Sequence, residues 1–253
     1  MIRLDELTVC VQGPISAETP IVVQHYLENP RISRVIFSTW TECFPLAHPK
    51  LTVVYNELPK KPGIGNRNLQ IVSSYFGLIL SQTKYSWKVR SDQIYDQACI
   101  NTYLDFFEDQ FNEKDPKIFA AGLYNKELFH IRDHNQISTT KKLIELWQCP
   151  LDEWIGPVDY TQCIRAEAYI VCHYLKRYST AAFTALMEPK KYLLDNAPER
   201  AMMLERSNQV MPKYFVAMPK VNFSWPKHGM AQYHYELTSR MHGEYWAENN
   251  NGL

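Results

Sequence analysis

The chain has 253 residues, of which 45% are hydrophobic and 21% charged, as in an ordinary globular protein and unlike a disordered one. Its 27 basic and 27 acidic residues balance, so no overall positive field draws it to nucleic acid or to an anionic membrane. We expect a reduced, cytoplasmic protein, because the six cysteines form no Cys-x-x-Cys pair, no apolar run is long enough to span a membrane, and residues 1–7 do not resemble a signal peptide.

The first half of the chain alternates strand-like and helix-like segments. Short apolar, β-branched runs predict strands over residues 7–12, 34–39, 51–55 and 85–89. Thr19-Pro20 predicts the start of one helix, and apolar residues at helical spacing predict another over 66–82. This alternation indicates an α/β fold with a Rossmann-like, mostly parallel central sheet flanked by helices.

Polar residues follow each of the four predicted strands. They are Gln12-Gly13-Pro14, Thr39-Trp40, Asn56-Glu57 and Arg90-Ser91-Asp92. Ligands of open α/β sheets bind at the carboxyl ends of the strands, and a helix that starts at Asn66-Arg67 would direct its free N–H groups to the same edge. The sequence therefore predicts a crevice for an anionic ligand, although Asp92 alone could equally be a helix cap. No Gly-x-Gly-x-x-Gly or phosphate-loop motif is present, which argues against a dinucleotide fold and a phosphate-loop ATPase.

The second half of the chain is less regular. Helices are predicted over residues 100–111, 139–147, 160–177 and 197–209, and strand-like runs over 118–124, 128–134 and 214–218. From residue 222 onward the sequence shows no clear helix or strand pattern, and it ends in a polar stretch. We therefore expect one domain over residues 1–220 and a C-terminal extension over 221–253, in a chain that could be one module of a longer protein.

Six parts of the sequence, taken in order, resemble successive motifs of one known family. They are Thr8–Ile15, Phe37–Trp40, Asn66–Ser74, Tyr85–Asp92, Phe129–Asp133 with Leu143–Trp147, and Ala166–Ile170. This series resembles the WavE lipopolysaccharide-synthesis family over about residues 7 to 175. The resemblance implies a glycosyltransferase of the GT-A type, which moves a hexosyl or deoxyhexosyl group from a nucleotide-diphosphate sugar to a glycan acceptor in surface polysaccharide or glycoprotein glycan synthesis.

The resemblance also implies a place for the donor and its cofactor. In such enzymes an Asp-x-Asp at a strand end holds a divalent ion that bridges the nucleotide diphosphate. Arg90-Ser91-Asp92 matches this position with Arg in place of the first acid, so Asp92 is the expected ligand of Mn²⁺ or Mg²⁺, and Arg90 could also neutralise a phosphate directly. The residues expected to bind the nucleotide sugar are Gln12, Gly13, Pro14, Thr39, Trp40, Asn66, Arg67, Arg90 and Ser91.

An inverting transfer needs a carboxylate that accepts the proton of the acceptor hydroxyl. Glu167 is favoured because an acid within an otherwise apolar helical run needs a reason, and Asp133 is the second choice. Asp152 and Asp159 stay open as candidates, as do His130 and His228 for a metal site. Each has a structural alternative, such as an ion pair between Glu167 and Arg165 or a loop cap at Asp133.

Two other functions remain open. A sugar-phosphate nucleotidyltransferase would share the sheet and the metal acid, but it should carry a basic, Gly-rich signature after the first strand, which residues 12–16 lack. A non-catalytic carbohydrate-binding module would explain the 13% aromatic content but not the polar strand ends. The expected partners are therefore a nucleotide-sugar donor and a glycan acceptor, with no nucleic acid and no transmembrane segment.

Overall fold

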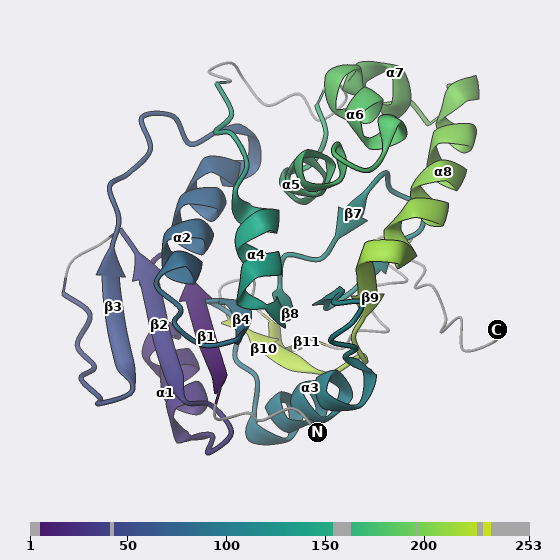
Figure 1. Ribbon diagram of the computed structural model, residues 1–253. Coiled ribbons are helices and arrows are strands. Elements are labelled where there is room, and N and C mark those ends of the chain that lie inside the picture. The colour runs from purple at the N-terminus through teal and green to yellow at the C-terminus, as the bar shows by residue number, and fades with distance from the viewer. Residues whose placement is uncertain (1–5, 41–42, 154–162, 196, 227–229, 234–253) are drawn as a thin grey trace.

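A seven-stranded sheet forms the centre of the computed structural model, which describes residues 6–40, 43–153, 163–195, 197–226 and 230–233 (Figure 1). The strand order is β3-β2-β1-β4-β8-β5-β9. The bounds are β1 Leu7–Gln12, β2 Arg34–Thr39, β3 Leu51–Tyr55, β4 Tyr85–Arg90, β5 Ile118–Ala120, β8 Asn135–Thr139 and β9 Phe215–Ala217. Strands β1 to β4 are parallel, and β8 runs antiparallel to both of its neighbours. The mostly parallel α/β sheet that the sequence predicted is confirmed.

Helices cover both faces of the sheet. On one face lie α1 (Thr19–Glu28) and α3 (Gln97–Gln110), and on the other α2 (Arg67–Ile79), α4 (Thr140–Trp147) and α5 (Ala166–Leu175) (Figure 1). Beyond α5 the chain forms α6 (Thr180–Met187), α7 (Pro189–Leu193) and the long α8 (Pro198–Tyr214). The remaining elements are a short 3₁₀ helix (Ile64–Asn66), a hairpin of β6 (Leu123–Tyr124) and β7 (His130–Ile131), and a pair of β10 (Phe223–Trp225) and β11 (Met230–Tyr233). No described helix is long and apolar enough to cross a membrane.

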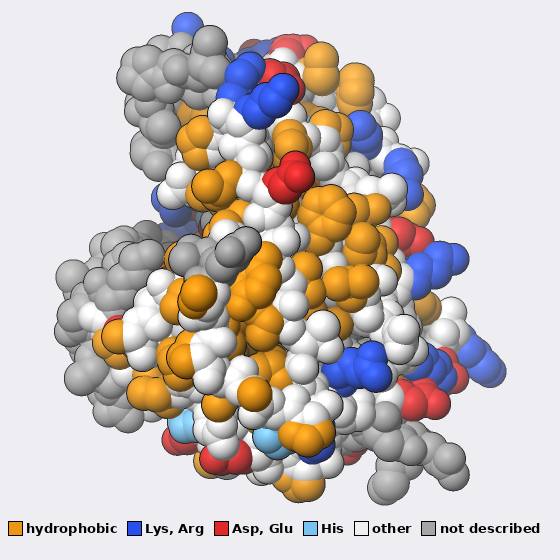
Figure 2. Space-filling model, turned by 90° about the vertical axis from the view of Figure 1, so that its left-hand side faces the viewer, with side chains coloured by type: hydrophobic (Ala, Val, Ile, Leu, Met, Phe, Trp, Pro, Cys, Tyr) orange, Lys and Arg blue, Asp and Glu red, His pale blue; other side chains and the backbone are white. Residues whose placement is uncertain are grey.

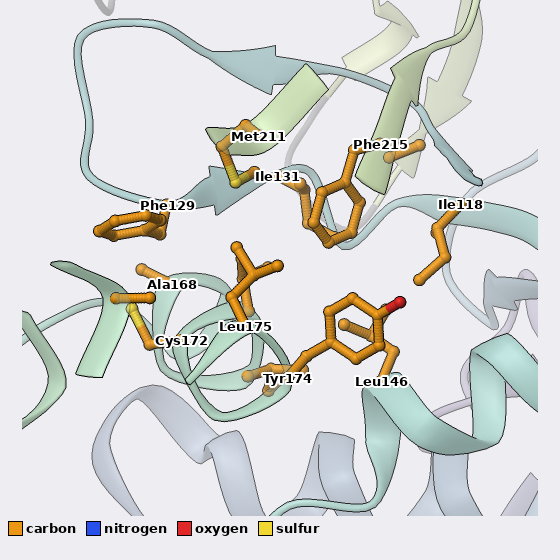
Figure 3. Packing of buried hydrophobic residues seen from close by; sticks show 14 of the residues in the cluster. Ile118, Phe129, Ile131, Leu146, Ala168, Cys172, Tyr174, Leu175, Met211 and Phe215 are labelled. Atoms are coloured by element: carbon orange, nitrogen blue, oxygen red, sulfur yellow. The ribbon is translucent and has the colours of Figure 1, made fainter. Parts of the chain in front are cut away.

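Each face of the sheet has its own apolar core. Strand β1 is buried along its whole length, as expected for a central parallel strand, with Val9 and Val11 in one core and Cys10 in the other. In the second core, Phe129 and Ile131 point toward Ala168 and Leu175 of α5 (Figure 3). This packing fixes the hairpin that contains His130 against α5.

Figure 2 views the molecule from the side of β3 and α2 and shows hydrophobic side chains grouped across this face. Exposed large apolar residues on these elements include Tyr55 of β3 and Phe76 and Ile79 of α2. Exposed apolar side chains are common on globular proteins, and we assign no function to this face.

Several predicted boundaries were wrong. Strand β8 lies within the described core but was missed, because Asn135, Gln136 and Ser138 do not form an apolar run. Their side chains are nevertheless buried, and Gln136 Oε1 accepts a hydrogen bond of 2.8 Å from the indole of Trp147. The runs over 118–124 and 128–134 form only short strands, and helices α6 and α7 were not predicted.

The late helices differ from the prediction at their ends. The helix predicted over 160–177 is described as α5 from residue 166 to 175, and residues 160–162 lie outside the described chain. The helix predicted over 197–209 continues to Tyr214. The domain boundary at residue 220 stays a prediction, with Val221 and Phe223 buried in the core beside it.

Candidate functional site

The carboxyl ends of β1, β2 and β4 lie side by side. In the sheet register Gln12 is paired with Ser38 on one side and with Arg90 on the other. The chain leaving β1 stays attached to both neighbours, because Gly13 donates its N–H to Ser38 O at 3.2 Å and Ser91 donates its N–H to Gln12 O at 2.9 Å. Three of the predicted polar strand ends therefore meet at one edge.

Gly13 lets the loop after β1 pack tightly against the loop after β4. Its φ is +133°, and a Cβ at this position would lie 2.4 Å from Ser91 Oγ. The Ser91 hydroxyl donates to Pro14 O at 2.8 Å, and the Thr19 hydroxyl donates to Ser91 O at 3.1 Å. A side chain at this position would collide with Ser91, and its residue would have to adopt a backbone conformation that L-amino acids disfavour. This explains why the residue after β1 is a glycine.

The guanidinium of Arg90 lies between two buried carboxylates. Its Nε and Nη2 donate to the two oxygens of Asp92, each at 2.9 Å, and its Nη1 donates to Asp133 Oδ2 at 2.8 Å. The side chains of Asp92 and Asp133 are only 4% and 7% exposed. Burial would raise the pKa of Asp133, but the charges of Arg90 and Lys88 hold that pKa well below its usual range. Asp133 is therefore ionised at neutral pH and is a weak proton acceptor.

Lys88 places a second cation behind this group. It lies two residues before Arg90 on β4, so the two side chains leave the same face of the strand. Its ammonium donates to Asp133 O and lies 4.7 Å from the ring centroid of Trp147. Burial lowers the pKa of Lys88 to about 8, and the charge of Asp133 opposes that shift. The end of β4 thus combines two basic side chains with two acidic ones.

The divalent cation expected at Asp92 does not fit these residues. Both Asp92 oxygens accept hydrogen bonds from Arg90, whose guanidinium fills the space that a cation shared with Asp133 would need. Among the described residues, no cluster of three or more His, Cys, Asp or Glu side chains could hold a metal ion. His228 lies outside the described residues. Metal binding at Asp92 stays a prediction that would require Arg90 to move.

A cavity of about 640 Å³ lies between the β6–β7 hairpin, the start of α5 and the α7–α8 segment. Glu167, in the first turn of α5, lines this cavity with its side chain 21% exposed. Burial raises the pKa of Glu167, and the negative charge of Asp133 raises it further. Glu167 is consequently a stronger base than an ordinary carboxylate, and it lies within electrostatic reach of the Arg90 group.

The end of β2 carries polar atoms that no described residue satisfies. Thr39 Oγ1 and Trp40 Nε1 are buried without a hydrogen-bond partner among the described residues. Gln12 Oε1, in contrast, already accepts a hydrogen bond of 2.8 Å from the Ser73 hydroxyl. Buried polar atoms normally have partners. Because these two atoms have almost no accessible surface, a ligand would reach them only if this strand end opened.

The two predicted residues at the start of α2 differ in orientation. Asn66 is exposed with a φ of 60°, whereas Arg67 is 2% exposed. Arg67 Nη2 donates to Ile164 O at 2.6 Å, its Nε lies 3.4 Å from Asp152 Oδ2, and its guanidinium covers the ring of Tyr169 at 4.3 Å. Arg67 therefore holds the segment before α5 in place instead of facing the rim, because its charge is neutralised inside the protein.

Two residues of the site were missed in the sequence. Lys88 lies in a run read as apolar, although the alternation of Ser86, Lys88 and Arg90 with apolar neighbours signalled a polar face. Glu127 pairs with His130 across a hairpin loop, and no sequence pattern identifies such a pair. Asp159, named as a possible base, lies outside the described residues.

No family model and no curated protein matches this chain. Among solved structures, the chain is similar to 4-diphosphocytidyl-2C-methyl-D-erythritol synthase from Anaerococcus prevotii, at 9% identity and a TM-score of 0.41 over 62% of this chain and 79% of that chain. It is similar to a cytidylyltransferase from Leptospira borgpetersenii, at 12% identity and a TM-score of 0.38 over 58% and 66%. It is also similar to HddC from Yersinia pseudotuberculosis, at 13% identity and a TM-score of 0.33 over 61% and 83%. Similarity at this level carries no argument about the reaction.

Proposed function

We propose that this chain is a transferase that binds a nucleotide-diphosphate sugar and passes the sugar to a glycan acceptor. The observation that carries the proposal is that two unlike regions lie within electrostatic reach of each other. One region is the end of β4, where Arg90 keeps N–H groups that its two acids do not use, and the other is the cavity lined by Glu167. Glycosyl transfer needs both, because negative charge builds on the leaving diphosphate while the acceptor hydroxyl loses a proton.

The donor diphosphate would lie against Arg90 and the loop Gln12-Gly13-Pro14. Three of the five guanidinium N–H groups of Arg90 donate to Asp92 and Asp133, and the side chain is still 21% exposed. Its remaining N–H groups suit the oxygens of a phosphate, since guanidinium forks bind phosphate in a bidentate manner. Thr39 Oγ1 and Trp40 Nε1 at the next strand end are buried, and they would meet another part of the donor only if that strand end opened.

The acceptor would enter the cavity, where Glu167 is the better placed of the two predicted catalytic carboxylates. Asp133 is held by Arg90 and has a lowered pKa, whereas Glu167 lines the cavity and has a raised pKa. In the proposed step the acceptor O–H bond breaks and the proton passes to Glu167. The oxygen then bonds to the anomeric carbon, and the bond from that carbon to the diphosphate breaks, with its electrons leaving on the diphosphate.

A thermal-shift panel of UDP-, GDP-, CMP- and dTDP-sugars tests donor binding, because a ligand that binds only the folded state raises the melting temperature. Arg90→Lys keeps the charge but loses the guanidinium fork, and it should weaken the shift. Arg31→Lys is the matched control, since Arg31 also contacts two acids but precedes β2, at the opposite edge of the sheet.

Product analysis then identifies the reaction. Glycosyl transfer releases a nucleoside phosphate from the donor only when an acceptor is present. Release of pyrophosphate from a nucleoside triphosphate and a sugar phosphate would instead establish the nucleotidyltransferase alternative. Stabilisation by free glycans without any response to nucleotides would point to a carbohydrate-binding module.

A further inference from the structure

His130 is buried between two glutamates of the cavity wall. It lies on β7, its side chain is 5% exposed, and its ring stacks on Tyr124 of β6 at a centroid distance of 4.3 Å. The neighbouring residues Phe129 and Ile131 point into the core against α5, so the backbone of His130 is fixed (Figure 3). His130 Nδ1 lies 2.5 Å from Glu127 Oε2, and its Nε2 lies 3.8 Å from Glu167 Oε2.

The contact with Glu127 determines which ring nitrogen carries the proton. Burial would raise the pKa of Glu127, but the hydrogen bond and charge of His130 and the charge of Arg165 lower it overall. Arg165 Nη2 contacts the other Glu127 oxygen at 3.0 Å. An ionised carboxylate only accepts hydrogen bonds, so Nδ1 must be the donor. Whenever the ring is neutral, Nε2 is then a bare acceptor that faces Glu167.

A bare Nε2 beside Glu167 favours the protonated form of that carboxyl group. At 3.8 Å the two atoms are not hydrogen-bonded. A movement of the Glu167 carboxyl group by about 1 Å would bring them to a normal hydrogen-bond distance. An ionised Glu167 has no proton to donate to Nε2, but a Glu167 that has just taken a proton does. The contact therefore becomes favourable only after proton transfer, which is the form of stabilisation that accelerates a reaction.

We infer that His130, oriented by Glu127, is a positioning residue that stabilises Glu167 after it has accepted the proton of the acceptor hydroxyl. This inference rests on the proposed function. In the step itself the hydroxyl O–H bond breaks, the proton goes to Glu167, and Glu167 then donates a hydrogen bond to His130 Nε2. His130 keeps its own Nδ1 proton on the side of Glu127 throughout.

Other charged groups also act on Glu167. Asp133, on the chain after β7, raises the pKa of Glu167, whereas Arg90 of β4 lowers it. Lys88 of β4 and Arg67 of α2 are also within electrostatic reach of Glu167. These groups remain in place when only His130 is changed, so a variant at residue 130 isolates its contribution.

The first test measures turnover and its pH profile in His130→Asn. Asparagine can still donate to Glu127 from a position close to that of Nδ1, but it has no atom in the place of Nε2. We expect donor affinity to be unchanged and kcat to fall by roughly 10²-fold, the low end of general-base effects. The acidic limb of the profile should move to lower pH, because the variant can no longer stabilise the protonated form of Glu167. A positively charged His130 would instead lower the pKa of Glu167, so an acidic limb that moves to higher pH would contradict the inference. His25→Asn is the matched control, since His25 Nδ1 also contacts an oxygen, Tyr95 O, but from α1.

The second test does not depend on catalysis. Nitrogen-15 NMR of labelled histidines should show His130 with its proton on Nδ1, and Glu127→Gln should remove that preference, because an amide can also donate. A proton found on Nε2 in the neutral ring would overturn the inference, as would a His130→Asn enzyme with wild-type kcat and pH profile. If the wild-type protein transfers no sugar from any donor, the proposed function fails, whereas the NMR result still decides whether His130 is oriented as inferred.

Discussion

Replacing Arg90 by methionine removes the cation that two buried carboxylates share. The side chains of Asp92 and Asp133 are 4% and 7% exposed, so water cannot take over the role of the guanidinium. Removal of one partner from a buried ion pair typically costs about 3–5 kcal/mol, because the other charge stays buried without compensation. We expect the free energy of unfolding at neutral pH to fall by about that amount.

Arg31→Met is the control for this substitution. Arg31 also contacts two acids, Asp105 at 2.6 Å and Glu108 at 2.9 Å, and at 24% its exposure is close to the 21% of Arg90. Its partners, however, are 71% and 26% exposed, so the loss should be about 1 kcal/mol or less. Urea unfolding of both variants measures the difference. Equal losses would refute the argument that burial of the carboxylates sets the cost.

The pH dependence gives a second, independent test of the same change. In the wild-type protein the folded-state pKa of Asp133 lies below its ordinary value of 3.8, so its contribution to stability is present above that value and is lost as the pH falls through the folded pKa. Without Arg90, burial would raise the pKa of Asp133, so the variant should gain stability as the pH falls from about 7 toward about 4. A difference in unfolding free energy between the two proteins that stays constant over this pH range would contradict the assignment of the cost to Asp133. If Arg90→Met does not fold, Arg90→Lys provides the graded version of the experiment.

Three further outcomes are expected. Gly13→Ala should lower stability by about 1–3 kcal/mol, measured by urea unfolding, because the methyl group collides with Ser91 and alanine disfavours the backbone conformation. Nucleotide affinity measured by calorimetry should be the same in EDTA and in Mn²⁺, because Arg90 already uses both oxygens of Asp92; a gain with Mn²⁺ that Asp92→Asn removes would contradict this. Asp133→Asn should strengthen binding of a nucleoside diphosphate, because Arg90 then has one acid fewer to neutralise, and weaker binding in calorimetry would refute that reading.

The central sheet could be predicted because its first four strands follow local rules. The run Leu7–Gln12 is apolar, β-branched and ended by Gly13-Pro14, which together allow few structures other than a buried strand. Strand β8 breaks that rule, since it is buried but carries Asn135, Gln136 and Ser138. Its polar groups are satisfied by residues such as Trp147, and such partners appear only when the chain has folded.

The candidate site, too, could be predicted only where it depends on residues that are close in the sequence. The sequence placed Arg90 and Asp92 at one strand end, and the turn that begins after Arg90 lets the two side chains meet. The orientation of Arg67 could not be predicted, because it depends on Ile164 and Asp152, which are distant in the sequence. The contact between Arg90 and Asp133 likewise joins the end of β4 to the chain after β7.

That contact changes the chemistry that the sequence motif suggests. Read alone, Arg90-Ser91-Asp92 offers a free cation for phosphate and a free carboxylate for a metal ion. In the folded protein the Arg90 guanidinium is hydrogen-bonded to both oxygens of Asp92, and it also donates to Asp133. With Lys88 included, two cations face two carboxylates, so a diphosphate would meet little net positive charge. Binding would therefore have to use the uncommitted N–H groups of Arg90 or displace one of its acids, and Asp133 is the acid whose removal distinguishes the two routes.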